Sequence, residues 1–185
     1  MNSLMIHETT ELNELLMSCT NSINSMGLFL SQVQCQELKS IIEKHMKGHI
    51  QDYNMKVEWA TKGTSHDTLD VPTMPPAVRM TGVADMQKTT PNPNTTKLDD
   101  RAIATSYLLT LKRAGREYAW ATFECANPEL RKFLEDAFTM CSRHAYEVSG
   151  YMIRKGYYPI QEAPNTYVQE LSGTYESVQN SGFVH

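Results

Sequence analysis

Hydrophobic and polar residues follow helical spacing over four long stretches of the chain. In the first stretch, apolar residues recur at alternating steps of four and three, which is a heptad pattern. Its members are Leu12, Leu16, Cys19, Ile23, Met26, Leu30 and Val33. The second stretch carries an apolar stripe made of Leu38, Ile41, Ile42, Met46, Ile50, Tyr53 and Val57. Each pattern predicts one long amphipathic helix.

Two similar stretches occupy the second half of the chain. The third has its apolar stripe at Ile103, Leu108, Leu111, Ala114, Tyr118 and Ala121. The fourth has its stripe at Leu130, Phe133, Leu134, Ala137, Phe138, Cys141, Ala145, Val148 and Met152. Together the four stripes predict helices over residues 8–33, 36–61, 99–125 and 128–155.

Residues that favour helix ends stand beside these stripes. Asn127 suits an N-cap, and Pro128 suits the first helical position, where no backbone N–H is needed. Gly63 and Gly156 are placed for left-handed C-caps. Pro159 prevents the fourth helix from continuing.

The connection 64–98 is rich in proline, which excludes a helix there. Its prolines are Pro72, Pro75, Pro76, Pro91 and Pro93. At about 3.3 Å per residue, an extended segment of this length spans a bundle from end to end. Two helical hairpins, 8–63 and 99–156, joined by such a crossover predict an all-α, four-helix bundle of the ferritin-like type.

We expect the crossover to lie against the bundle as a strap rather than to hang free as a linker. Its expected anchors are Val71, Met74, Val78, Met80, Val83 and Met86. The bundle then spans residues 1–164, and residues 165–185 form a polar C-terminal tail. An arm for self-association or for a partner is the functional alternative for this tail.

Composition and charge narrow the class of protein. The chain has 41% hydrophobic and 21% charged residues, as ordinary globular proteins have. Its net charge of −4 argues against nucleic acid as a partner. No apolar run approaches the roughly 18 residues that a membrane span needs. His7 and Glu8 directly follow the first apolar residues, which argues against a signal peptide, so we expect the chain to stay in the cell that makes it.

The four cysteines form no C-x-x-C pair, so a zinc or thioredoxin-like site is not indicated. They are Cys19, Cys35, Cys125 and Cys141. We expect small buried hydrophobes, with Cys35, at a turn between two helices, as the best candidate for an exposed thiol that could crosslink.

The C-terminal hairpin resembles a known family. KLDDRAIATSYLLTLKRAGREYAWATFECA, and PELRKFL followed one helix later by YMIRKGYYP, closely resemble the spore coat protein F (Coat F) family of endospore-forming bacteria. HETTELNELL near the start resembles it more weakly. The resemblance covers residues 97–159 strongly and 5–34 weakly, and it rests on helix faces and ends rather than on catalytic residues.

This resemblance implies a structural or assembly component of the endospore coat that acts through protein–protein contacts. Such a protein is made in the cytoplasm of the sporulating mother cell and then placed in the coat, where other coat proteins are its partners. The apolar seam of the first helix favours a homodimer or a higher homo-oligomer. Two alternatives stay open: a metal-binding ferritin-like protein with a non-standard ligand set, and a soluble adaptor in sporulation or germination.

No residue pattern indicates a catalytic, cofactor-binding or metal-binding site. A ferritin-like di-iron centre needs Glu-x-x-His pairs, and no histidine of the chain has a Glu three residues before it. His45 and His49 lie one turn apart and could share a metal with Glu43 or Asp52, but we expect both rings on a solvated face. We therefore predict a protein that is not an enzyme.

Other side chains favour ordinary packing or surface roles. For His144 and Glu147, one turn apart, a surface hydrogen bond is expected. Tyr118 is expected in the core, whereas an exposed Trp120 would mark an interaction surface.

Overall fold

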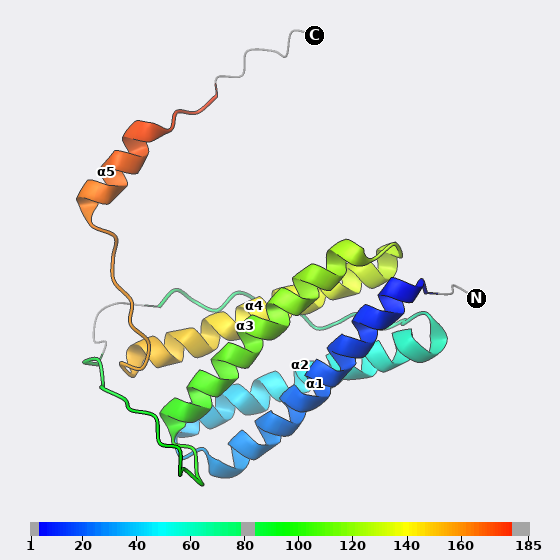
Figure 1. The fold of residues 1–185 in the computed structure, drawn as a ribbon, viewed down its shortest axis with the longest axis horizontal. Helices are drawn as coiled ribbons and strands as arrows, with labels where there is room; N and C mark the ends of the chain where they lie inside the picture. Colours follow the sequence, from blue (N-terminus) through cyan, green and yellow to red (C-terminus); the bar gives the residue numbers. More distant parts are fainter. Residues whose placement is uncertain (1–3, 79–83, 179–185) are drawn as a thin grey trace.

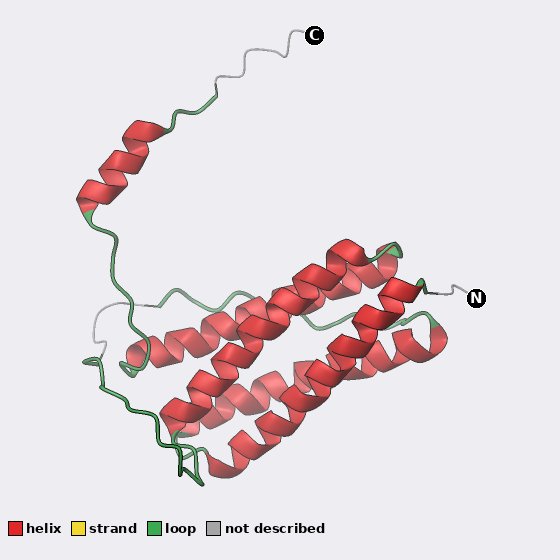
Figure 2. Ribbon diagram, in the orientation of Figure 1, coloured by secondary structure: helices red, strands yellow, loops and turns green. Residues whose placement is uncertain are grey.

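The computed structural model describes residues 4–78 and 84–178. In these residues the regular secondary structure is all α-helix, with no strand (Figure 2). The elements are α1 (Ile6–Gln32), α2 (Gln36–Lys62), α3 (Asp100–Glu124), α4 (Pro128–Arg154) and α5 (Asn165–Thr174). The four predicted helices are confirmed, with ends that differ by at most two residues. None of the described helices is both long and apolar enough to cross a membrane.

The four long helices form a bundle in which each packs against two others (Figure 1). The hairpins are α1–α2 and α3–α4, and α1·α3 and α2·α4 contacts join them. Hydrogen bonds at the two ends show that α1 and α3 run antiparallel. The Gln34 N–H, just after α1, donates to Asp100 at the start of α3, and the Ala126 N–H, just after α3, donates to Glu8 near the start of α1. The single long crossover between α2 and α3 is the connectivity that ferritin-like bundles use, but kinship with them stays a prediction.

Each turn of the bundle is tied to the opposite hairpin by one carboxylate. Asp100 accepts N–H bonds from Gln34 at 2.8 Å and Cys35 at 3.0 Å in the α1–α2 turn. Glu8 is buried and accepts from Ala126 at 2.9 Å and Asn127 at 2.7 Å in the α3–α4 turn. The two contacts satisfy backbone groups that helix ends leave unpaired, and they hold the hairpins in register.

The residues predicted to cap the helices have the expected conformation and contacts. The Asn127 side chain accepts from the backbone N–H groups of Glu129 and Leu130, and Pro128 takes the first turn. Gly63 and Gly156 both have φ of 69°, in the left-handed region. A Cβ on Gly156 would lie 2.3 Å from the carbonyl oxygen of Asp85, so this glycine also allows the crossover to approach α4.

The crossover lies along the bundle, but two of its six expected anchors, Met74 and Met86, are wrong. Leu69 is the buried anchor and packs in the same core cluster as Trp59. Met74 and Met86 are exposed. A hydrogen bond to the backbone of the segment also holds it: the Arg143 guanidinium donates to the Pro72 carbonyl. Val71 and Val78 are half-buried, and Met80 and Val83 lie outside the described residues.

The inward face of α2 is shifted by one residue from the predicted stripe. Beyond Ile42, the buried residues of this helix are His45, His49, Asp52, Met55, Lys56 and Trp59. Met46, Tyr53 and Val57 are only half-buried, and Ile50 is 44% exposed. One residue is a rotation of about 100° around a helix, and packing against the other helices selected the polar side.

The other stripes need smaller corrections. On α1 the deeply buried residues include Leu15, Ser22 and Phe29 rather than Leu16, Ile23 and Leu30, which lie at the edge. On α4, Phe138 is 43% exposed. Its ring covers Gly115 at the rim of the α3–α4 contact, so only part of it is out of water.

The core consists of two apolar clusters, one toward each end of the bundle. One is built around Leu12, Trp59 and Leu134, and the other around Met26, Ile42 and Leu108. Between them lies a layer of buried polar side chains.

Candidate functional site

All four long helices contribute to this polar layer, which we call the buried polar cluster. Its members are Cys19, His45, His49, Asp52, Lys56, Tyr107, Tyr118, Cys141 and His144. Burying a polar group without a partner costs free energy, so the contacts within the cluster decide what it can do.

One half of the cluster is centred on His45. Nδ1 of His45 lies 3.0 Å from the Tyr107 hydroxyl, and Nε2 lies 2.8 Å from a Glu147 carboxylate oxygen. Burial lowers the pKa of His45, although Glu147 acts in the opposite direction. A neutral ring fits both contacts if it donates from Nε2 to Glu147 and accepts the Tyr107 proton at Nδ1.

Glu147 connects this buried ring to the surface. Its second oxygen accepts from the Lys44 ammonium at 2.5 Å. The hydrogen bond from His45, with Lys44, lowers the pKa of Glu147 to about 2. The carboxylate therefore stays ionised at neutral pH, while His45 stays uncharged beside it.

The other half of the cluster is an ion pair with no exposure to water. Lys56 Nζ lies 2.5 Å from Asp52 Oδ2, and the Tyr118 hydroxyl donates to the same oxygen at 2.6 Å. Burial alone would lower the pKa of Lys56, but the adjacent Asp52 raises it. Burial also raises the pKa of Cys19, whose thiol contacts Asp52, to about 12. This thiol is therefore protonated and not a nucleophile at neutral pH.

His144 completes the cluster from α4. Its ring stacks on His45 with centroids 3.7 Å apart and planes 14° apart, and its Nδ1 is buried without a hydrogen-bond partner. Burial lowers the pKa of His144 to about 2 and that of His49 to about 4. All three imidazoles are therefore neutral at physiological pH.

Three neutral imidazoles resemble a metal site in composition but not in geometry. A ring nitrogen directs its lone pair in the plane of the ring, so stacked rings such as His45 and His144 cannot aim at one ion between them. Both nitrogens of His45 are also engaged already. Among the described residues, no group of three or more His, Cys, Asp or Glu side chains is arranged to hold a metal ion.

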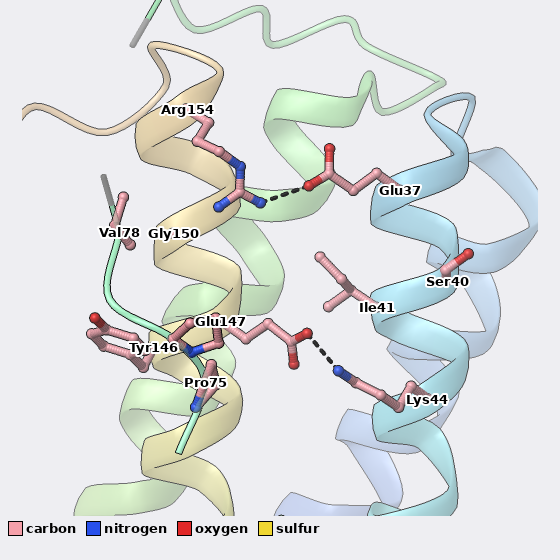
Figure 3. A pocket seen from close by; sticks show the side chains of 11 residues that line it. Glu37, Ser40, Ile41, Lys44, Pro75, Val78, Tyr146, Glu147, Gly150 and Arg154 are labelled. Carbon is pink, nitrogen blue, oxygen red and sulfur yellow. Dashed lines mark hydrogen bonds and ion pairs between the residues drawn. The ribbon is translucent and has the colours of Figure 1, made fainter. Parts of the chain in front are cut away.

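A groove lies between α2 and α4 (Figure 3), and Glu147, which bonds to His45, lines it. Figure 3 shows Glu147 reaching Lys44 and Arg154 reaching Glu37 across this groove, at 2.5 and 2.6 Å. The hollow holds about 360 Å³, and a neighbouring one of about 520 Å³ reaches His144. Pro75 and Pro76 of the crossover line both, so the chain itself partly fills the groove.

The expectation that His45 and His49 lie on a solvated face is wrong. His45 is 0% and His49 is 4% exposed, because this side of α2 faces Tyr107 and His144. Glu147 bonds to His45 and Lys44, and His144 is buried, so the expected surface bond between His144 and Glu147 is also wrong. A signal was present: His45, His49, Asp52 and Lys56 repeat at steps of four and three, as a core stripe does.

The thiols mostly follow the prediction. Cys19, Cys125 and Cys141 are buried, and Cys35 is half-buried in the α1–α2 turn. Leu12, Cys19 and Met26 from the seam of α1 are buried in their own bundle. These three residues are therefore not available to a second copy of the chain, while Leu16, Ile23, Leu30 and Val33 are half-buried at the edge.

Large apolar side chains lie on the outer surface of the bundle. Tyr118 is buried as expected, whereas Trp120 is 68% and Phe123 79% exposed. Leu109 on the same helix and Met17 on α1 are also more than half exposed. Exposed tryptophan and phenylalanine are typical of protein interfaces.

Comparisons with known proteins agree with the sequence resemblance. The family model of the Coat F domain matches residues 99–161, which include all of α3 and α4. The chain is 21% identical over 175 residues to the spore coat protein F-like protein YhcQ of Bacillus subtilis (strain 168). That match covers 94% of this chain and 81% of YhcQ. No solved structure matches the chain. The predicted resemblance to the Coat F family is confirmed.

Proposed function

From the premise that residues 99–161 form a Coat F domain, we propose that the protein is a structural component of the bacterial endospore coat. It is made in the cytoplasm of the sporulating mother cell and then joins the coat by contacts with other coat proteins. The single observation that carries this proposal is the Coat F match, which falls on one complete hairpin of the bundle.

The chemistry of the interior supports a structural role. Most polar groups of the cluster are hydrogen-bonded: His45 with Tyr107 and Glu147, and Asp52 with Lys56 and Tyr118. Among the described residues, His144 Nδ1 and Asp52 Oδ1 have no partner. Such a network stabilises one arrangement of the helices, and it leaves function to the outer faces. We propose accordingly that the protein is not an enzyme.

The outer faces supply groups for assembly. Trp120 and Phe123 belong to the matched hairpin and are exposed on it. We propose one bundle domain over residues 1–164 and a separate C-terminal segment over 165–185, with the bundle as the folded unit that the coat incorporates. The crossover strap is part of that unit because it bonds to α4.

Localisation during sporulation tests this proposal. A fluorescently tagged copy, expressed from its own promoter in a spore-forming host, should appear in the mother cell and then form a ring around the forespore. The protein should also be recovered in coat extracts of mature spores. Diffuse fluorescence that persists through sporulation, with no protein in the extracts, would contradict a coat role and would favour a soluble adaptor.

A further inference from the structure

We infer that the C-terminal arm, residues 160–178, docks on the outer face of α3 of a second copy of this chain. This inference rests on the proposed function and specifies how assembly would occur. The arm contains α5 and has no buried residue, and in Figure 1 it projects away from its own bundle.

The arm has an unpartnered apolar face. Tyr167, Val168 and Leu171 recur at steps of one and three, so α5 presents them on one side, and Tyr175 follows directly after the helix end. All four are exposed, between 45% and 75%. A ten-residue helix is marginally stable in water by itself, so packing of this face against another surface would stabilise it.

The charge of the arm selects the kind of surface that it fits. From Gly156 to the C-terminus the chain contains no Lys or Arg. Its charged side chains there are Glu162, Glu170 and Glu176. A matching surface is therefore apolar with basic groups at its edge.

The outer face of α3 has this character. Leu109, Arg116, Trp120 and Phe123 follow one another at steps of seven, four and three and form what we call the α3 ridge. All four are exposed. Arg116 has no ion pair or side-chain hydrogen bond with any other described residue, so its guanidinium is free to meet a carboxylate.

A groove runs beside the ridge, between α1 and α3. It holds about 490 Å³, and Met17, Arg116 and Trp120 line it. Glu11 and Glu14 line the α1 side of the groove. Their charge would repel Glu170, so the arm would place Glu170 toward Arg116 and its apolar face toward Trp120.

A docking contact of this kind joins two different surfaces. Each copy donates an arm and accepts another arm on its α3 ridge, so the contact can repeat from copy to copy without closing. Such open association suits the building of a layer. The tether between α4 and α5 would also permit docking on the same chain, and the experiment separates the two cases.

Charge reversal in the full-length protein tests the contact. Arg116→Glu and Glu170→Arg should each weaken concentration-dependent association, measured by sedimentation equilibrium, roughly two- to fivefold, as expected for loss of a surface ion pair. Leu171→Asp should weaken it on the order of 10- to 100-fold. Lys47→Glu is the matched control, because it makes a charge change of the same size at an exposed position of α2, and it should leave the association unchanged. Circular dichroism should confirm that all variants are folded.

Mixing the two single variants identifies the partner. In an equimolar mixture every arm can find an oppositely charged ridge on the other variant, so association should return toward the wild-type level. Docking within one chain would give no such recovery. A wild-type protein that stays monomeric at high micromolar concentration, or variants that associate as strongly as wild type, would overturn the inference. These association measurements do not depend on where the tagged protein localises, so the docking inference and the proposed coat role can be contradicted independently.

Discussion

The buried pair of Asp52 and Lys56 is the most unusual residue-level feature of this bundle. Both side chains are fully buried, and they share contacts with Tyr118 and Cys19. Removing two charges from water is unfavourable unless geometry and hydrogen bonds compensate. The pair therefore works against any packing of the helices that would separate the two groups, and it helps to specify one register of α2.

Removing the cation tests this role. Lys56→Met leaves the Asp52 carboxylate buried without a counter-charge, and we expect the free energy of unfolding to fall by about 3–5 kcal/mol in urea titrations. Lys62→Met is the matched control, since Lys62 also pairs with an acidic residue four positions earlier but in an exposed place. Its effect should stay within about 0.5 kcal/mol. Similar losses in both variants would contradict a special role for the buried pair.

The neutral histidines make the stability of the fold sensitive to acid. Burial lowers the pKa of His49 to about 4 and that of His144 to about 2. In the unfolded chain these rings take up protons near pH 6.5. The stabilisation is therefore complete above about pH 6.5 and is lost as the pH falls from 6.5 toward 4 for His49 and toward 2 for His144, because only the unfolded chain gains the protons.

We therefore expect the melting temperature to be constant from pH 7 to 8 and to fall steadily from pH 6.5 to 4.5. His49→Gln should reduce the slope of this fall, whereas His66→Gln, at an exposed position in the crossover, should leave it unchanged. Glu147, with its pKa lowered to about 2, stabilises the fold fully above about pH 4.5 and loses this contribution only below that pH, so it does not affect the slope in this range. A melting temperature that does not change between pH 7 and 5 would mean that the imidazoles are not buried and neutral.

At the scale of elements, α4 has the clearest division between an inner and an outer face. Leu134 is buried, while Phe138, one turn later on the same helix, is partly exposed at the rim. The two positions belong to one apolar stripe in the sequence, but the structure gives them different surroundings.

Leu134→Asp and Phe138→Asp form a matched pair of variants on α4. An aspartate at position 134 would be buried without a partner, a cost of several kcal/mol against a total stability of about 5–15 kcal/mol. We expect Leu134→Asp to abolish the cooperative thermal transition in circular dichroism. Phe138→Asp should keep the transition at a lower temperature. Equal behaviour of the two variants would show that the inner face of α4 is wrongly placed.

At the scale of the whole molecule, the crossover holds the second hairpin as well as connecting it to the first. Gly156 brings it close to the end of α4: the Ala84 N–H donates to the Arg154 carbonyl at 3.2 Å, and the Gln87 N–H donates to the Gly156 carbonyl at 3.3 Å. Both the positive φ and the short distance to Asp85 require glycine at this position.

Gly156→Ala should therefore release this part of the crossover. We expect faster cleavage within residues 84–98 by a protease of broad specificity, together with a destabilisation of about 1 kcal/mol or more. Gly173→Ala is the matched control, because a Cβ there meets no atom within 4 Å and alanine favours a helix. If the two variants are cleaved at equal rates, the contact at Gly156 does not hold the crossover.

The sequence alone determined the helices, their ends and the two hairpins. These features depend on interactions between residues at most four apart: the spacing of apolar side chains, the cap at Asn127 and the left-handed glycines. Proline density gave the long crossover for the same local reason. The Coat F resemblance also lies in such helix faces and ends, which is why it was recognisable.

The tertiary structure decided which side of α2 faces inward and what lies in the middle of the core. A polar stripe and an apolar stripe one residue apart are both possible inner faces, and the choice depends on partners from other helices. The partners of His45 are Tyr107 and Glu147, which lie 62 and 102 residues away in the chain. Only the assembled bundle brings such groups together, so the local pattern, which offered both stripes, could not decide that His45 and the Asp52–Lys56 pair are the buried ones.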